Sequence, residues 1–159
     1  MISPVSLGRA HRIALTSCTL IAITVFAAPE QTTNALTQIR SVLQGQQAAW
    51  NRGDIDGFMN GYARSASTVF ISEDTIRRGW QTVRDRYRKK YSSRGKMGTL
   101  AFSDLEITLL SSDSAMASGR WTLNRANDQP QGRFTLILRR LPEGWRIVYD
   151  HTSAASPPK

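Results

Sequence analysis

The sequence predicts an α+β fold: a cone-shaped, strongly bent antiparallel sheet wraps against three N-terminal helices and encloses a pocket. In residues 35–53 and 55–62, apolar side chains recur at spacings of three and four, which is the period of an amphipathic helix. From residue 100 to residue 153, apolar and polar residues alternate in stretches separated by turn residues, which indicates strands joined by turns. Helices segregated from such a sheet are typical of α+β proteins, and the interior of a cone is a natural small-molecule pocket.

The first 27 residues have the layout of a secretory signal peptide. Arg9, His11 and Arg12 form a positive segment, and an apolar run covers residues 13–26. Ala27 supplies the small residue that a signal peptidase requires at its cleavage site. We therefore expect cleavage after Ala27 and a periplasmic or secreted protein.

Two alternatives for this segment stay open. Residues 15–18 resemble a bacterial lipobox, which would make Cys18 a lipidated first residue, and the segment could also persist as an uncleaved anchor. We favour cleavage, because the apolar run continues past Cys18 and is too short and too rich in Thr and Ser for a stable membrane span. Cleavage would remove Cys18 and His11, which leaves His151 as the only histidine.

The chain is basic, with 21 Lys and Arg residues against 12 Asp and Glu residues and a formal charge of +9. Loss of Arg9 and Arg12 would lower that charge to +7. Such a charge favours anionic partners, but an exported protein rarely meets nucleic acid, so we expect a small-molecule partner and no nucleic acid. The densest basic segment is 84–96. A solvated helix face explains it most simply, and an anion-binding rim or a membrane-surface contact is the sharper hypothesis.

Composition divides the chain into segments. We expect residues 28–34 to form a flexible linker, residues 35–153 to form the folded domain and residues 154–159 to form a disordered, Pro-rich tail. Gly53 is expected to end the first helix, because glycine readily adopts the left-handed conformation found there. Asp54 is expected to cap the second helix.

A third helix and five strands complete the predicted domain. The pattern indicates a short strand at 68–71, then a turn, then a helix over about residues 81–92. Near Ser103 and Asp104 the apolar residues change phase, which indicates a β-bulge that bends the sheet. Four longer strands are expected in a meander, over about residues 100–109, 115–124, 132–141 and 144–153.

The closing strand, GWRIVYDHTS, carries the candidate acid–base residues. Asp150 and His151 are adjacent, so regular alternation points them to opposite faces unless a bulge intervenes. His151 shares its face with Trp145, Ile147 and Tyr149. This face is the more apolar of the two, so we expect it to line the cone. His151 is then the favoured acid or base of the pocket, with a buried structural histidine as the plainer alternative.

The other candidate residues have plain alternatives as well. Asp150 is expected to pair with Arg133 or Arg146 rather than to act as a base. Tyr62 is the candidate hydrogen-bond donor that would polarise a substrate carbonyl. The predicted ligand-binding residues are the aromatic walls and one cation for an anionic ligand group: Tyr62, Tyr87, Trp121, Trp145, Tyr149 and Arg133. The aromatic residues could equally be ordinary core residues, and Arg133 could be an exposed charge on a strand.

Three segments resemble the SnoaL-like group of the nuclear transport factor 2-like superfamily. They are residues 49–58 (AWNRGDIDGF) followed by Tyr62, residues 119–121 (GRW) with 132–135 (GRFT), and the closing strand. The resemblance implies the cone-shaped fold. It implies function only broadly, since the superfamily contains ketosteroid isomerases, polyketide cyclases, epoxide hydrolases, dehydratases, a kinase association domain and many pocket proteins without assigned activity. The sequence resembles that last, unassigned group most.

We therefore expect an exported pocket protein of unassigned activity that binds a small hydrophobic or amphipathic molecule and forms a homodimer through its sheet face. One alternative is an isomerase, cyclase or dehydratase that uses His151 or Asp150 as acid or base and Tyr62 as donor. Another is a non-catalytic dimerisation or assembly module. Neither a metal nor a cofactor is expected, because the sequence has no metal-ligand spacing and no glycine-rich phosphate loop.

Overall fold

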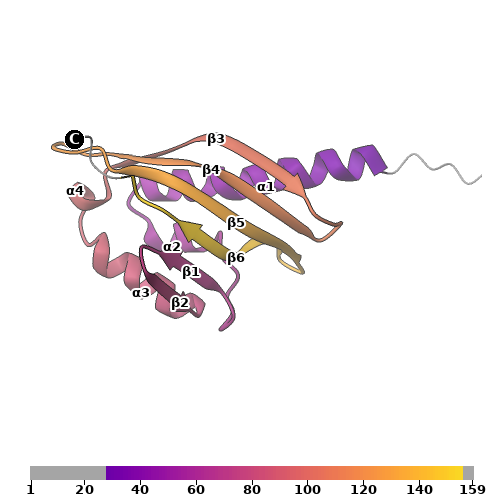
Figure 1. Cartoon of the computed structure of the whole chain (residues 1–159), viewed down its shortest axis with the longest axis horizontal. Helices are drawn as coiled ribbons and strands as arrows, with labels where there is room; N and C mark the ends of the chain where they lie inside the picture. Colours follow the sequence, from indigo (N-terminus) through magenta and orange to yellow (C-terminus); the bar gives the residue numbers. More distant parts are fainter. Residues whose placement is uncertain (1–27, 156–159) are drawn as a thin grey trace, which may run out of the picture.

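The computed structural model describes residues 28–155, so the predicted signal peptide lies outside the described residues. In chain order the elements are α1 (Ala28–Asn51), α2 (Ile55–Met59), β1 (Val69–Ser72), β2 (Thr75–Arg78), α3 (Trp80–Lys90), α4 (Arg94–Met97), β3 (Thr99–Leu109), β4 (Ser114–Asn124), β5 (Gln131–Leu141) and β6 (Gly144–Thr152). Helices precede the long strands, as Figure 1 shows. The predicted α+β class is therefore confirmed.

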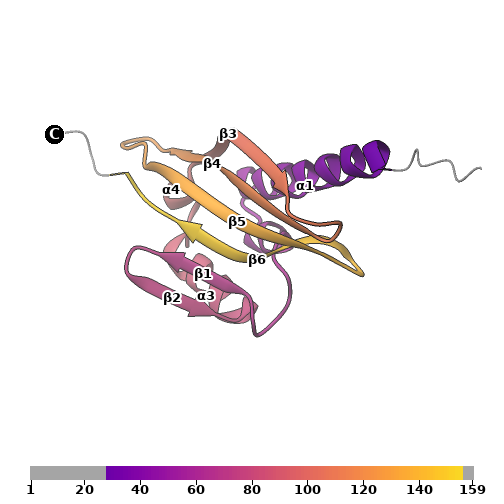
Figure 2. The same ribbon diagram turned by 45° about the vertical axis from the view of Figure 1, so that its right-hand side comes forward.

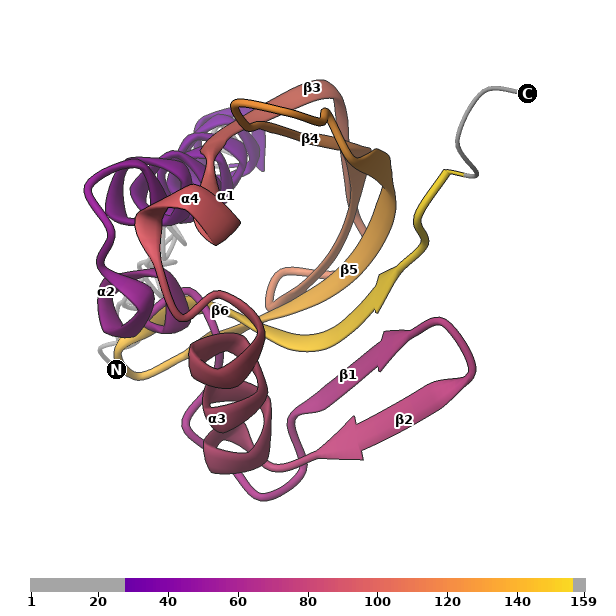
Figure 3. The same cartoon turned by 90° about the vertical axis from the view of Figure 1, so that its left-hand side faces the viewer.

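A single six-stranded sheet runs in the order β2-β1-β6-β5-β4-β3. β1 pairs in parallel with β6, and the other neighbours pair antiparallel. The sheet curls strongly without closing. In Figure 3, β3 to β6 curve around one side of the molecule, and α1, α2 and α4 occupy the other side. This arrangement confirms the predicted cone, whose concave face is turned toward the helices.

α1 begins earlier than predicted, because residues 28–34 belong to the helix rather than to a flexible linker. Ile39, Leu43 and Trp50 on its apolar side are buried, and α1 lies along β3 and β4 in Figures 1 and 2. The helix ends where expected, since Gly53 adopts a φ of 86°, a conformation that costs glycine little.

Asp54 caps α2, as predicted. Its carboxylate Oδ1 accepts a hydrogen bond from the backbone N–H of Gly57 at 2.7 Å, which satisfies one of the free amides at the start of the helix. Phe58 and Met59 then face the core. Tyr62 follows directly and forms a parallel bridge with Ile147 of β6, so this short helix delivers the Tyr62 ring to the sheet.

The predicted β-bulge in β3 is confirmed. The pairing of β3 with β4 shifts register between Ser103 and Glu106, and Asp104 has a φ of 50°. Such a bulge increases the local twist and bend of a strand. It helps β3 to follow the curl of the sheet around the core.

The sequence pattern did not predict β2 or α4. β2 contains Arg77 and Arg78, and most of its side chains are exposed, so it lacks the apolar alternation that identifies a strand. α4 is a single turn, capped by Ser93, whose Oγ accepts from the backbone N–H of Lys96. Among the described helices, none has both the length and the apolar character needed to cross a bilayer.

Candidate functional site

A cavity of about 110 Å³ lies inside the curl of the sheet. Its wall contains six apolar aromatic rings: Trp50, Phe58, Phe70, Phe102, Trp121 and Phe134. A buried water needs roughly 10–15 Å³ of such volume, so the cavity has room for a small organic molecule. An apolar wall with a few polar groups is the usual make-up of a small-molecule site.

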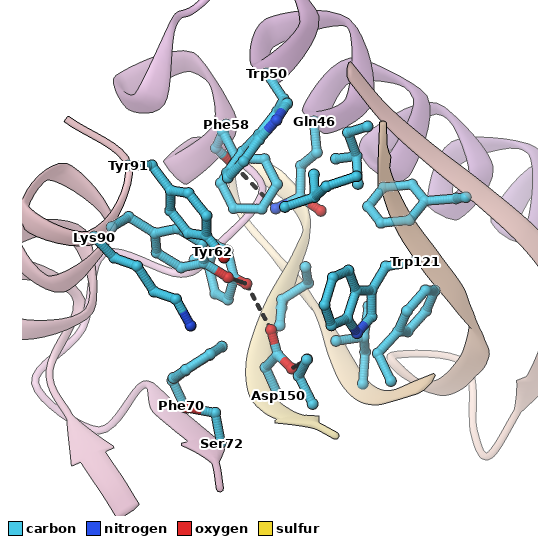
Figure 4. A pocket seen from close by; sticks show the side chains of 18 of the residues that line it. Gln46, Trp50, Phe58, Tyr62, Phe70, Ser72, Lys90, Tyr91, Trp121 and Asp150 are labelled. Carbon is cyan, nitrogen blue, oxygen red and sulfur yellow. Dashed lines mark hydrogen bonds between the residues drawn. The ribbon is translucent and has the colours of Figure 1, made fainter. Parts of the chain in front are cut away.

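Asp150 is the buried carboxylate of this cavity, and only 3% of the residue is exposed. The Tyr62 hydroxyl donates to Asp150 Oδ2 at 2.6 Å, and the Thr152 hydroxyl donates to Asp150 Oδ1 at 2.7 Å. Figure 4 shows the Tyr62 and Asp150 side chains pointing toward each other. Each carboxylate oxygen thus has one donor, which holds the group in a fixed orientation.

Burial raises the pKa of Asp150 from its ordinary value of 3.8 to about 6. The hydrogen bonds from Tyr62 and Thr152 and the positive charge of Arg86 oppose this shift, but they do not cancel it. A carboxyl group with a pKa close to neutral can both accept and return a proton near physiological pH, which is the property required of a general acid or base.

Tyr62 and Tyr87 supply neutral hydroxyl groups at the same place. Their two hydroxyl oxygens lie 3.4 Å apart. Because Tyr62 already donates to Asp150, Tyr87 is the donor in this contact. Burial raises the pKa of both phenols, so neither ionises near neutral pH. The result is a short chain of hydroxyls that ends on the Asp150 carboxyl.

The expected placement of His151 in the pocket is wrong. His151 is exposed and does not line the cavity. The reason is a bulge in β6: Ile137 of β5 pairs with Tyr149, whereas the adjacent Leu138 pairs with Ile147. The extra residue, Val148, reverses the alternation, so Asp150 takes the inward position that an unbroken strand would give to His151.

Asp150 makes neither of the ion pairs expected for it. Within the described residues, Arg133 forms an ion pair with Asp104 instead, with Nη2 at 3.7 Å from Oδ2. Arg146 donates to the backbone carbonyl of Trp145 at 2.8 Å. Both arginines are thus held away from Asp150, which leaves its carboxyl with hydroxyl partners only.

The predicted ligand-binding residues divide into two groups. Tyr62, Tyr87 and Trp121 line the cavity. Trp145, Tyr149 and Arg133 do not. Trp145 is fully buried in the core, and the bulge of β6 turns Tyr149 outward to an exposure of 38%. Arg133 is an exposed charge on β5, which was the plainer alternative for its position.

Ser72, Arg86 and Lys90 line the cavity but were not among the predicted ligand-binding residues, although Arg86 and Lys90 belong to the basic segment for which an anion-binding rim was one hypothesis. Arg86 Nη2 donates to Ser72 Oγ at 3.0 Å, and the Arg86 guanidinium lies over the Phe70 ring at 4.6 Å. The sequence contained a sign of this position. Arg86 and Lys90 are four residues apart, as are Tyr87 and Tyr91, and residues at this spacing lie on the same side of a helix. The many other basic residues in this segment made it impossible to tell from the sequence which of them line the cavity.

Trp121 closes part of the wall through a backbone contact. Its indole Nε1 donates to the carbonyl of Ser153 at 3.0 Å. The close approach depends on Gly132, where a Cβ atom would stand 2.0 Å from the same carbonyl oxygen. Among residues 28–155, no group of three or more His, Cys, Asp or Glu side chains is arranged to hold a metal ion.

Comparisons with known proteins agree with the overall fold. The model of the SnoaL-like domain family matches residues 39–157. The search of curated proteins finds no significant match. A solved nuclear transport factor 2-like protein of unknown function from Shewanella oneidensis is 39% identical, with a TM-score of 0.70, and the match covers 77% of this chain and 98% of that one.

Two more distant structures are similar in fold. A nuclear transport factor 2-like protein of unknown function from Pseudomonas putida is 20% identical, with a TM-score of 0.66 and coverage of 80% of this chain and 91% of that one. A ketosteroid isomerase-like protein from Erwinia carotovora atroseptica is 20% identical, with a TM-score of 0.62 and coverage of 77% and 97%.

Proposed function

This chain belongs to the SnoaL-like domain family, and on that premise we propose that its cavity binds a small hydrophobic or amphipathic molecule. The strongest support is the cavity itself, which combines an aromatic wall with one buried carboxyl group. An open cavity also counts against a purely structural module, in which side chains would fill the cone. We further propose export, with cleavage after Ala27, on the basis of the signal-peptide layout of the N-terminal segment.

Native mass spectrometry of the protein purified from its own host tests the binding proposal. We expect a bound small molecule that is released on denaturation. The variant Leu136→Trp places an indole in the cavity, which Leu136 lines, and should lose the bound molecule. Leu138 is buried but does not line the cavity, so Leu138→Met is the matched core control and should retain it. A bound molecule that survives Leu136→Trp would refute binding in this cavity.

A second candidate function is acid–base catalysis, which the environment of Asp150 favours. The buried carboxyl, with a pKa of about 6, would remove a proton from a carbon next to a carbonyl group. The neutral Tyr62 and Tyr87 hydroxyls would orient the carboxyl or donate to the developing oxyanion. The reaction class is that of an isomerase, cyclase or dehydratase, with Asp150 in the role for which His151 was the favoured candidate.

Deuterium exchange into a simple ketone tests this chemistry without a known substrate. We expect the protein to accelerate exchange at the α-carbons of 2-indanone in D₂O, followed by NMR. Asp150→Asn should abolish the acceleration, because the amide cannot accept the proton. His151→Asn places the same amide side chain at the exposed neighbour and should leave the rate unaltered. Equal rates in the unaltered protein and in Asp150→Asn would exclude this role for Asp150.

We also propose a homodimer formed through the outer face of the sheet. Met116 of β4 pairs with Ile137 of β5, and Ile137 pairs with Tyr149 of β6. These neighbours form an apolar stripe on the convex face, where Met116 and Tyr149 are 37% and 38% exposed. No described helix covers this side of β4, β5 and β6 in Figure 2. An apolar stripe on an uncovered sheet is a suitable contact surface for a second copy.

A further inference from the structure

Basic side chains gather beside the cavity. Arg86 and Lys90 stand one helical turn apart on α3, and both line the cavity. In Figure 4 the Lys90 side chain extends toward the side of the pocket on which Ser72 and Asp150 lie. Partial burial and the positive charges of Arg86, Arg125 and Arg77 lower the pKa of Lys90. Arg86 and Lys90 thus place two cationic groups at the wall of the cavity.

Among the described residues, Lys90 has only a weak ion-pair partner. The nearest carboxylate of Lys90 is Glu73, with Oε1 at 4.0 Å from Nζ and a side chain that is 75% exposed. An ion pair so long and so exposed contributes little. By contrast, Arg84 and Arg88 on the same helix both pair with Asp56. Arg84 and Arg88 thus share one carboxylate at short range, whereas the contact of Lys90 with Glu73 is long.

Two buried guanidinium nitrogens have no hydrogen-bond partner among the described residues. They are Nη1 of Arg77 and Nε of Arg125. Arg125 has an ion pair through Nη1, at 3.4 Å from Asp128, but its Nε is not part of it. A buried charged donor without an acceptor is costly, but neither arginine lines the cavity, so the charged contacts for a ligand come from Lys90 and Arg86.

We propose that the cavity takes an amphipathic anion, whose apolar body lies among the aromatic rings and whose acidic head group lies against Lys90 and Arg86. This inference rests on the proposed binding function and names its ligand class. Trp50, Phe58 and Trp121 offer flat apolar surface for one or two rings. The ammonium of Lys90 and the guanidinium of Arg86 supply charged donors at the edge of that surface.

The matched ligands 1-naphthaleneacetate and 1-naphthaleneacetamide test the inference, because they differ in charge and hardly in shape. Isothermal titration calorimetry should find the carboxylate about tenfold tighter, the typical effect of a hydrogen bond to a charged group. Lys90→Met retains the apolar stem of Lys90 and should remove this preference. Lys89 is exposed on the same helix and does not line the cavity, so Lys89→Met is the matched control and should retain the preference.

Glu73→Gln is a second test, in which the expected result is tighter binding, and a misfolded protein would not bind more tightly. Removing the carboxylate beside Lys90 should tighten 1-naphthaleneacetate binding about two- to fivefold and leave the amide unchanged. If the two ligands bind equally, or if Lys89→Met acts as strongly as Lys90→Met, the anion inference is overturned while cavity binding stands. If neither ligand binds and Leu136→Trp retains the native molecule, both the inference and the proposed function fail.

Discussion

At the scale of single residues, the Tyr62 hydroxyl lowers the pKa of Asp150. It donates to Oδ2 at 2.6 Å, and this hydrogen bond favours the ionised carboxylate, so it opposes the rise in pKa that burial causes. Tyr62→Phe removes the donor and leaves the ring in place. We expect the pKa of Asp150 to rise from about 6 by roughly one unit or more, since a hydrogen bond to a charged group stabilises it by about 1.5–3 kcal/mol.

A carbon-detected NMR titration of the Asp150 carboxyl measures this change. Tyr149→Phe is the matched control, because the Tyr149 ring is exposed and its hydroxyl has no part in the hydrogen bonds of Asp150. It should leave the titration unchanged. An unchanged or lower pKa of Asp150 in Tyr62→Phe would contradict the role assigned to this hydroxyl.

Burial of Asp150 also makes stability depend on pH. Asp150 binds its proton more tightly in the folded chain, with a pKa of about 6, than at its ordinary value of 3.8. The neutral form therefore stabilises the fold at low pH, and this contribution is lost as the pH rises through about 6. The shift corresponds to about 3 kcal/mol in full. Asp150→Asn removes the titration and keeps a side chain of similar shape.

We expect the free energy of unfolding of Asp150→Asn, relative to the unaltered protein, to rise by about 2–3 kcal/mol between pH ~4 and pH ~7.5. Urea denaturation at the two pH values measures this difference. The pKa values of Asp54, Asp56 and Asp113 are lowered, so these groups act in the opposite direction. They are present in both chains and cancel in the comparison. A difference that is constant with pH would contradict the raised pKa of Asp150.

At the scale of elements, the two bulges show what a sequence pattern can reveal. In β3 the apolar residues themselves change phase near Asp104, so the bulge was predictable. In β6 the extra residue is Val148, between the apolar Ile147 and Tyr149. An apolar residue inserted between apolar neighbours leaves no visible break in the alternation. Only the pairing with β5 decides which of Asp150 and His151 points inward.

The order of helices and long strands was predictable for a related reason. The apolar face of α1 and the alternation in β4 to β6 each repeat a buried position several times, and β3 repeats partly buried apolar positions. One irregular residue therefore does not change the interpretation. β2 gave no such repetition. The cations of the cavity wall were harder still, because Arg86 and Lys90 are two of many basic residues in the segment 84–96, and only the fold shows that these two line the cavity.

The bulge of β6 makes His151 dispensable. We expect His151→Ala to change the free energy of unfolding by less than about 0.5 kcal/mol, as is usual for an exposed position. Ile147→Ala, four residues earlier and fully buried, should cost about 2–5 kcal/mol. Urea denaturation of both variants at one pH makes the comparison. A large loss of stability in His151→Ala would mean that His151, rather than Asp150, occupies the inward position.

At the scale of the whole molecule, the curl of the sheet separates two surfaces. The concave face, with the helices, encloses the cavity and the Asp150 carboxyl group. The convex face carries the Met116, Ile137 and Tyr149 stripe. Because the two surfaces lie on opposite sides of one sheet, we expect substitutions to alter the proposed ligand binding and the proposed self-association independently.

Tyr149→Lys tests the convex face without touching the cavity. A lysine in the centre of an apolar contact must be buried with its charge, which is costly, so we expect the dimer to dissociate at least about tenfold more readily. Sedimentation velocity over a range of protein concentrations measures this. Gln44→Lys adds the same charge at an exposed position of α1 and should leave the dimer intact. If the unaltered protein sediments as a monomer at every concentration, or if the two variants behave alike, the proposed dimer through the outer sheet face is wrong.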